Sequence, residues 1–164
     1  MENLKNKILK LLTENARYTN RQIADMLGEK ESDVANGSAE LENDGVIVKY
    51  TAILNHEADP KNSMVQALIE VKVAPQKLKG FDSYAEDLYH FKEVSSLFLM
   101  SGGFDLAIFV EGNTLSDIAK FVSEKLSIID GIIGVQTHFI LKKYKVEGQI
   151  TILKEESKRQ IIGA

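Results

Sequence analysis

The spacing of the apolar residues changes once along this chain of 164 residues. In the first third, apolar side chains recur every three or four positions, as they do on one face of a helix. From residue 64 the period becomes two, which is typical of a half-buried strand. The alternating apolar residues there are Val65, Ala67, Ile69, Val71 and Val73. We therefore predict two domains, 1–54 and 64–153, joined by a polar linker at 55–63 and followed by a tail at 154–164.

Helix-end signals predict three helices in the first domain. The first helix lies within residues 3–13, where the apolar residues form one stripe. Thr19 and Gln22 form a capping box that opens the second helix. Gly28 ends it, because glycine adopts a positive φ without a Cβ penalty. The third helix runs from about residue 30 to residue 43.

Two short apolar runs follow the third helix, at 46–48 and 52–54, and we predict them as strands. Three helices followed by a small β-ribbon is the element order of a winged helix-turn-helix. The first domain is therefore predicted to be a DNA-binding domain of this class.

The second domain alternates strand and helix signals. Strands are predicted at 64–73, 94–100, 104–110 and 135–141, and helices at 81–91 and from Thr114, which forms a capping box with Asp117. Ser101-Gly102-Gly103 is a tight hairpin signal between the second and third strands. The order βαββαβ predicts a ferredoxin-like fold, so the whole chain is assigned to the α+β class.

Composition argues against several classes of function. The chain has no cysteine and its three histidines lie far apart, so we predict no disulfide, metal site or cofactor. No nucleophile, base and orienting group can be assembled, so no catalytic residue is named and the protein is predicted not to be an enzyme. No apolar run approaches the roughly 18 residues of a membrane span, and the N-terminus lacks a secretory pattern. We expect a cytoplasmic protein without a membrane partner.

Motifs in both halves of the chain point to one family. In the first half they are Ile8-Leu9, Leu11-Leu12, Asn15-Ala16-Arg17, Ile23-Ala24, Leu27-Gly28, Val34, Leu41-Glu42 and Gly45-Val46-Ile47. In the second half they are Ser101-Gly102-Gly103-Phe104-Asp105, Gly131-Ile132 and Thr137. Their joint order resembles that of the Lrp/AsnC (leucine-responsive, feast/famine) transcription regulators, over about residues 4–146.

The resemblance implies a DNA-binding domain joined by a hinge strand to an amino-acid-sensing domain that forms homodimers and often octamers. We accordingly expect a sequence-specific transcription regulator whose partners are double-stranded DNA, a small amino-acid effector and further copies of itself. The candidate DNA contacts are Arg17, Arg21, Lys30, Ser32, Asn36, Ser38 and Lys49. The candidate effector contacts are Met100, Gly102, Gly103, Asp105 and Thr137.

Each candidate site has a chemical reason. The Asn36 amide can make a bidentate contact with adenine, and basic side chains near helix N-termini and wings contact phosphates. At the glycine turn, exposed backbone N–H groups can bind the carboxylate of a free amino acid, while Asp105 pairs with its ammonium group.

The charge of the third helix opposes DNA binding. Between Glu29 and Gly45 there are six acidic residues and one basic residue, and residues 1–60 carry the whole net charge of −4. Gly37 and Ser38 stand about where the family has Arg and a β-branched residue, and a helical Gly costs about 1 kcal/mol relative to Ala. An alternative hypothesis is therefore a ligand-binding oligomeric interaction protein, with a weakened or lost DNA-binding helix, that pairs with a partner regulator.

Overall fold

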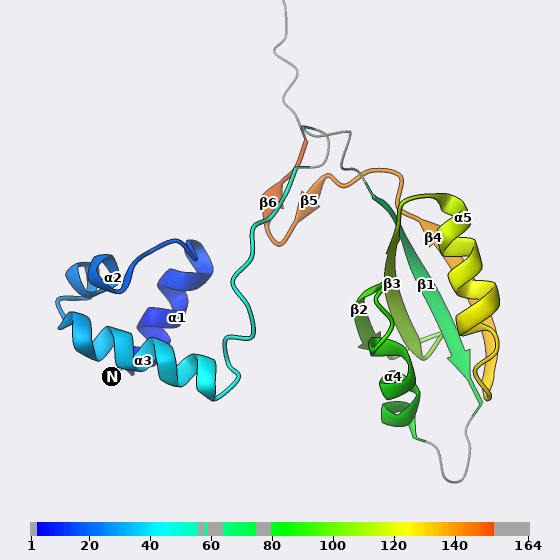
Figure 1. The fold of residues 1–164 in the computed structure, drawn as a ribbon, viewed down its shortest axis with the longest axis horizontal. Helices are drawn as coiled ribbons and strands as arrows, with labels where there is room; N and C mark the ends of the chain where they lie inside the picture. The colour runs from blue at the N-terminus through cyan, green and yellow to red at the C-terminus, as the bar shows by residue number, and fades with distance from the viewer. Residues whose placement is uncertain (1–2, 56–57, 59–63, 75–79, 153–164) are drawn as a thin grey trace, which may run out of the picture. The chain divides into compact units, whose positions relative to one another are not determined.

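The computed structural model describes residues 3–55, 58, 64–74 and 80–152 of the chain (Figure 1). It divides into two compact units, Met1–Ile53 and Leu54–Ala164, each with its own apolar core. Most of the predicted linker 55–63 and all of the predicted tail 154–164 lie outside the described residues. Within the described residues, no helix is long and apolar enough to cross a membrane.

The first unit is a three-helix domain. Its helices are α1 (Leu4–Glu14), α2 (Asn20–Leu27) and α3 (Glu31–Asn43). The predicted capping box at Thr19 is present, and Gly28 ends α2 with a φ of 68°. The three helices meet in one core of Ile8, Ile23, Ala24, Val34 and Leu41. The three predicted helices and the helix-turn-helix order are confirmed.

Gly37 has a packing role in the middle of α3. A Cβ atom at this position would lie 2.9 Å from Cδ1 of Ile8, which is fully buried on α1. The absence of a side chain at Gly37 therefore lets α1 approach the backbone of α3 closely. Although glycine lowers helix propensity, α3 continues as a helix through Gly37.

The two strands predicted after α3 are not formed, and this prediction is wrong. Residues 47–55 have no regular secondary structure, although the Ile47 N–H donates to Leu41 O at 3.0 Å and the Tyr50 hydroxyl to Glu42 Oε1 at 2.9 Å. The side chain of Val48 is 89% exposed. Residues 49–51 contain no Gly or Asn to make a tight hairpin turn, and an isolated two-stranded ribbon is marginal in water.

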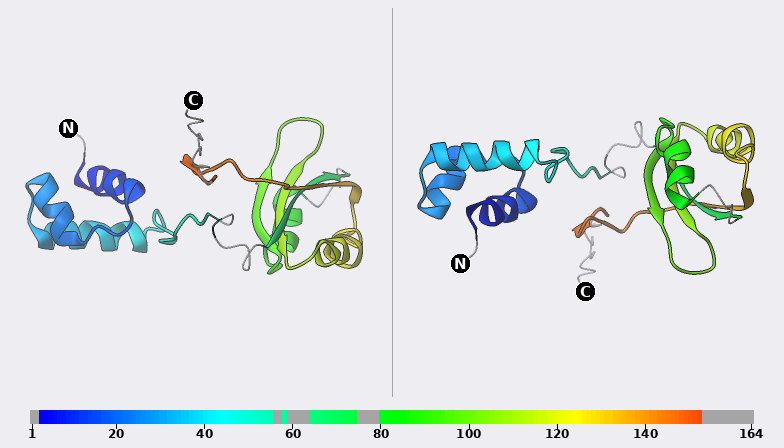
Figure 2. Two further views of the ribbon diagram at one scale, coloured as in Figure 1. Left: turned by 90° about the horizontal axis from the view of Figure 1, so that it is seen from above. Right: turned by 90° about the horizontal axis from the view of Figure 1, so that it is seen from below.

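The second unit is a four-stranded antiparallel sheet covered by helices on one face (Figures 1 and 2). The strands are β1 (Val65–Val73), β2 (Val94–Leu99), β3 (Leu106–Gly112) and β4 (Ile132–Phe139), in the order β2-β3-β1-β4. The helices are α4 (Phe81–Tyr89) and α5 (Leu115–Lys120), which continues as a π-helical segment, η2 (Phe121–Leu126). The predicted ferredoxin-like order is confirmed.

Alternation along β1 separates a covered sheet face from an open one. The odd-numbered residues from Ala67 to Val73 are at most 5% exposed and pack with Tyr84 and Leu88 of α4 and with Ile118 of α5. The capping box of Thr114 and Asp117 is present at the start of α5. The even-numbered residues of β1 point to the opposite face, which α4 and α5 leave uncovered.

A two-residue hairpin follows the sheet. Its strands are β5 (Lys145–Val146) and β6 (Gln149–Ile150), which pair in a separate two-stranded sheet.

We predict that Gly37→Ala and Ile8→Val are coupled in their effect on stability. In the wild type the new methyl group meets Cδ1 of Ile8, whereas Ile8→Val removes that atom. The change in the free energy of unfolding caused by Gly37→Ala, measured by urea denaturation, should therefore be more stabilising in the Ile8→Val background than in the wild type. The difference between the two changes should be about 0.5 to 1 kcal/mol. Equal responses in the presence and absence of Ile8→Val would mean that the close contact does not explain the glycine.

We also predict a pH-dependent contribution from Glu93. Its Oε1 accepts a hydrogen bond from Lys125 Nζ at 2.7 Å, and this bond holds the pKa of Glu93 below its ordinary value although burial opposes it. A carboxylate with a lowered folded-state pKa stabilises the fold at neutral pH, and this stabilisation is lost as the pH falls through that pKa.

Glu93→Gln should therefore lower the free energy of unfolding by about 0.5 kcal/mol at pH 7, a small value because the pair is partly exposed. Thermal denaturation at several pH values measures the difference from wild type, which should shrink below pH 4.5, the ordinary pKa of the group. A difference that is unchanged at acidic pH would contradict the assignment.

Candidate DNA-binding and effector sites

The burial pattern of α3 defines which way the helix faces. Its buried residues, Val34, Gly37, Ser38 and Leu41, follow the spacing of one helical stripe. At about 100° per residue, the positions directly opposite this stripe carry exposed side chains. They are Ser32, Asn36, Ala39 and Asn43, and we call them the outward face of α3. The outward face contains no carboxylate.

The acidic residues of α3 lie on its flanks, and several have partners. Lys5 Nζ of α1 lies 2.6 Å from Glu40 Oε2 and 3.6 Å from Asp44 Oδ2. The hydrogen bond to Glu40 raises the pKa of Lys5 above its ordinary value. On the other flank, Glu42 accepts the hydrogen bond from the Tyr50 hydroxyl. The excess of acidic residues in the sequence is thus directed away from the outward face and is partly neutralised.

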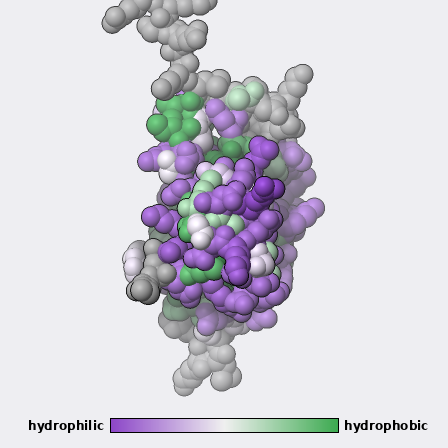
Figure 3. Space-filling view, turned by 90° about the vertical axis from the view of Figure 1, so that its left-hand side faces the viewer, coloured by the Kyte–Doolittle hydropathy of each residue, from purple (hydrophilic) through white to green (hydrophobic). Residues whose placement is uncertain are grey.

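The four basic candidates for DNA contact are all exposed. Arg17 lies in the turn before α2, where its backbone N–H donates to Asn15 Oδ1 at 3.0 Å. Arg21 lies in the first turn of α2, Lys30 is the N-cap of α3, and Lys49 lies after α3. Figure 3 shows that the surface of this unit turned towards the viewer is mainly hydrophilic.

Ser38 requires a correction. Its side chain is 7% exposed, and its hydroxyl donates to Asn20 Oδ1 at 3.4 Å. Ser38 therefore joins α3 to the start of α2 and is not available to a base. Ala39 and Asn43 take its place on the outward face, and the sequence analysis missed them. A projection of α3 around Val34 and Leu41 would have found them, because these two apolar residues define the buried side.

The glycine turn connects β2 to β3. It is closed by the N–H of Met100, which donates to Asp105 O at 2.8 Å. Gly102 has a φ of 155°, and Cβ atoms built on Gly102 and Gly103 meet no atom within 4 Å. The backbone of the turn is therefore accessible to a small ligand, and the side chain of Met100 is 43% exposed beside it.

Asp105 has a structural role that the sequence did not indicate. Its carboxylate Oδ2 accepts the backbone N–H of Val73 at 2.9 Å, at the end of β1. Its own N–H donates to Val71 O at 2.9 Å. Asp105 is half-buried, so its carboxylate is held in one place by β1 while it remains within reach of a ligand at the turn.

Thr137 lies away from Asp105 within one chain. It is half-buried on β4, where its register partner on β1 is Ile69. Asp105 lies at the other side of β1, beside Val71, so strand spacing and rise place the two Cα atoms about 12 Å apart. The fold therefore brings Met100, Gly102, Gly103 and Asp105 together and leaves Thr137 apart. Among the described residues, no group of three or more His, Asp or Glu side chains could hold a metal ion.

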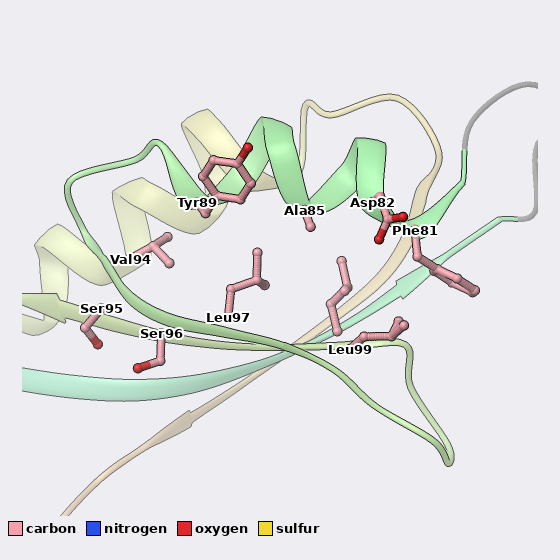
Figure 4. A pocket seen from close by; sticks show the side chains of 10 residues that line it. Phe81, Asp82, Ala85, Tyr89, Val94, Ser95, Ser96, Leu97 and Leu99 are labelled. Atoms are coloured by element: carbon pink, nitrogen blue, oxygen red, sulfur yellow. The ribbon is translucent and has the colours of Figure 1, made fainter. Parts of the chain in front are cut away.

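A groove lies beside the glycine turn, between α4 and the edge strand β2 (Figure 4). Its volume is about 310 Å³, which is at the small end of the range for ligand pockets. Leu99 and Leu106, which directly flank the residues of the turn, line one part of it. In Figure 4 Leu97 of β2 and Ala85 of α4 face the same space. Its lining is mostly apolar and includes one carboxylate, Asp82.

Comparison with known proteins agrees with both units. Residues 1–48 match the model of a winged helix-turn-helix DNA-binding domain, and residues 66–150 match the Lrp/AsnC ligand-binding domain. The chain is 41% identical, over 95% of its length and 94% of the relative, to the uncharacterized HTH-type transcriptional regulator YugG of Bacillus subtilis.

Solved structures of the same kind share the fold. A transcriptional regulator of Neisseria meningitidis, determined in complex with L-Met, is 26% identical with a TM-score of 0.69, and the match covers 89% of this chain and 93% of that one. The AsnC family regulator of Agrobacterium tumefaciens has a TM-score of 0.70 at 24% identity, covering 93% and 96%.

These matches define the class of protein as a helix-turn-helix transcriptional regulator with a ligand-binding domain. The chain belongs to the Lrp/AsnC family. The alternative of an interaction protein that has lost its DNA-binding helix is not favoured, because the relatives are regulators and the outward face of α3 is free of carboxylates.

Proposed function

We propose that the outward face of α3 enters the major groove of double-stranded DNA and contacts base edges through Ser32, Asn36 and Asn43. The observation that carries this proposal is the absence of carboxylates from that face, which is the side opposite the buried stripe. Amide side chains suit this role, because Asn can pair with both N6 and N7 of adenine.

Four basic side chains supply the phosphate contacts in this proposal. They are Arg17, Arg21, Lys30 and Lys49, all exposed around the two ends of the helix-turn-helix. Phosphate contacts fix the register of the protein on the duplex and carry no sequence information. This division of roles gives a sequence-specific regulator, which we place in the cytoplasm.

The flanking carboxylates distinguish this function from the interaction-protein alternative. Glu31 and Asp33 lie in the first turn of α3, on either side of the outward face. Replacing both by Lys should strengthen DNA binding and make it more salt-dependent if α3 faces phosphates. The same change should leave DNA binding absent if the helix serves only as a protein surface.

We further propose that the glycine turn binds a free amino acid. The open backbone of Gly102 and Gly103 offers N–H groups to the ligand's carboxylate, and Asp105 offers a fixed negative charge to its ammonium group. The apolar groove between α4 and β2 lies next to the turn. The relative from Neisseria meningitidis, whose structure contains L-Met, supports an amino acid as the class of effector.

Self-association completes the proposal. The segment 46–55 has exposed apolar side chains and no strand partner in the described chain, and the open sheet face carries Leu68, Phe98 and Phe109. A homodimer would cover such surfaces, and an octamer would combine four dimers.

In an assembly, Thr137 of a second copy can approach the glycine turn that Thr137 of the same chain cannot reach. Effector binding would then alter the spacing of the DNA-binding units and the half-sites that they meet together.

Asn36→Ala should weaken specific DNA binding while the fold persists. Loss of a bidentate base contact costs about 1 to 3 kcal/mol, and binding to a scrambled duplex should change little. The measurement is fluorescence anisotropy with the promoter fragment of the protein's own gene, against a scrambled fragment of equal length. The matched control is Ser38→Ala, which removes a buried hydrogen bond and should lower the melting temperature more than it lowers specificity. Equal affinities of Asn36→Ala and wild type for the specific fragment would refute the assignment.

Asp105→Asn should weaken the response to the effector and keep the fold. The amide oxygen of Asn can still accept the Val73 N–H, so the melting temperature should stay near that of wild type, whereas Asp105→Ala should cost about 1 kcal/mol of stability. Removing the charge should weaken amino-acid binding about tenfold or more, because charge-assisted hydrogen bonds are about twice as strong as neutral ones. Thermal shift and calorimetry with a panel of the twenty amino acids measure both effects, and an unaltered effector response in Asp105→Asn would place the site elsewhere.

A further inference from the structure

The hairpin after the sheet is a well-formed element of the second unit. Its turn residues, Glu147 and Gly148, have φ values of 44° and 80°, the left-handed conformation of the tight turns that favour hairpins. At its base, the buried Thr151 donates from its hydroxyl to Lys143 O at 2.9 Å and from its N–H to Tyr144 O at 3.1 Å. The side chains before the turn are therefore displayed on an ordered backbone.

The hairpin concentrates positive charge. Three of the four residues from Lys142 to Lys145 are lysines, and the fourth, Tyr144, is 65% exposed. Lys142 Nζ lies 5.5 Å from the centre of the Tyr144 ring, so one cation is held against the aromatic face. Within the part of the chain that the structure describes, no ion pair joins Lys143 or Lys145 to a carboxylate.

The described residues around Lys143 supply no carboxylate. The cavity next to the hairpin is lined by apolar and neutral polar residues together with Lys142 and Lys143, and no carboxylate is among its described lining residues. From 132 to 152 the sequence contains these three lysines and one acidic residue, Glu147. A cluster of like charges on a rigid ribbon is costly by itself, and a polyanion that approaches it gains from releasing its counterions.

We propose that this basic hairpin, Lys142–Lys145 with its turn, binds the phosphate backbone of the DNA duplex whose bases α3 contacts. The proposal rests on DNA binding by the first unit, as proposed above. The first unit carries an excess of acidic residues and only four basic candidates for phosphate contact. Lysines in the second unit would therefore add phosphate contacts that the first unit lacks. Tyr144 adds an exposed hydroxyl that can donate to phosphate, as tyrosines do at DNA interfaces.

The experiment measures the salt dependence of DNA binding by the full chain. The probe is a duplex that the wild type selects from a random library, and a scrambled duplex of the same length serves for comparison. Affinities are determined by fluorescence anisotropy from about 50 to 200 mM salt, the range over which counterion release is large. The test variant is Lys143→Gln with Lys145→Gln, and the charge-retaining variant carries Arg at both positions. The matched control is Lys92→Gln with Lys120→Gln, which removes two exposed lysines elsewhere in the same unit.

In the test variant the slope of log affinity against log salt should become less negative by about 2 for each chain that touches the duplex, with an affinity loss of about tenfold. Because phosphate contacts carry no sequence information, the loss should be equal on the selected and scrambled duplexes. The Arg variant and the Lys92/Lys120 control should retain the wild-type slope. Melting curves of all variants should coincide, since the substituted side chains lie outside the apolar core of the sheet.

Two results would overturn the hairpin proposal alone. One is a slope of log affinity against log salt in the Lys143/Lys145 variant that equals the wild-type slope. The other is an equal change of this slope in the Lys92/Lys120 control, which would mean that the net charge of the chain explains the effect. A wild-type chain that selects no duplex from the library would instead overturn DNA binding by the first unit, and this proposal with it.

Discussion

The contact between Ile8 of α1 and the bare backbone at Gly37 of α3 sets the orientation on which the first unit depends. Because α1 lies so close, one side of α3 is committed to the core through Val34, Ser38 and Leu41. The opposite side, with the exposed residues Ser32, Asn36, Ala39 and Asn43, is then left open to a partner. A side chain at Gly37 would meet Cδ1 of the fully buried Ile8, so either side chain has to adjust to the other.

Electrostatics follow from the same packing. Lys5 lies on α1 beside Glu40 and Asp44, so the helix that supports α3 also supplies the cation for one of its acidic flanks. A chain of net charge −4 can therefore present a neutral face of Ser and Asn to DNA. Positive charge is placed at the ends of the helix-turn-helix and, in the proposal made above, on the hairpin of the second unit. Affinity for phosphates and recognition of bases are then carried by different residues.

In the second unit the central strand β1 fixes the position of Asp105, the candidate residue for contact with the effector. Asp105 is tied to the end of β1 through Val73, so the glycine turn starts from a rigid sheet. Its carboxylate has both a structural hydrogen bond and the charge that an ammonium group would meet, which explains why Asn and Ala at this position are expected to differ. Thr137 lies across β1 at another level, so within one chain it is separated from the residues of the glycine turn.

The sequence determined the elements of the fold, because helix caps and apolar periods are local. Thr19 with Gln22, Thr114 with Asp117, and Gly28 mark ends that the structure reproduces. The strands expected at 46–48 and 52–54 are absent, because a strand needs a hydrogen-bond partner that no local pattern supplies. Tertiary structure alone decided that Gly37 is a packing position, that Lys5 pairs with Glu40 and Asp44, and that Asp105 caps β1. These properties depend on which residue of another element lies opposite, and that neighbour is distant in sequence.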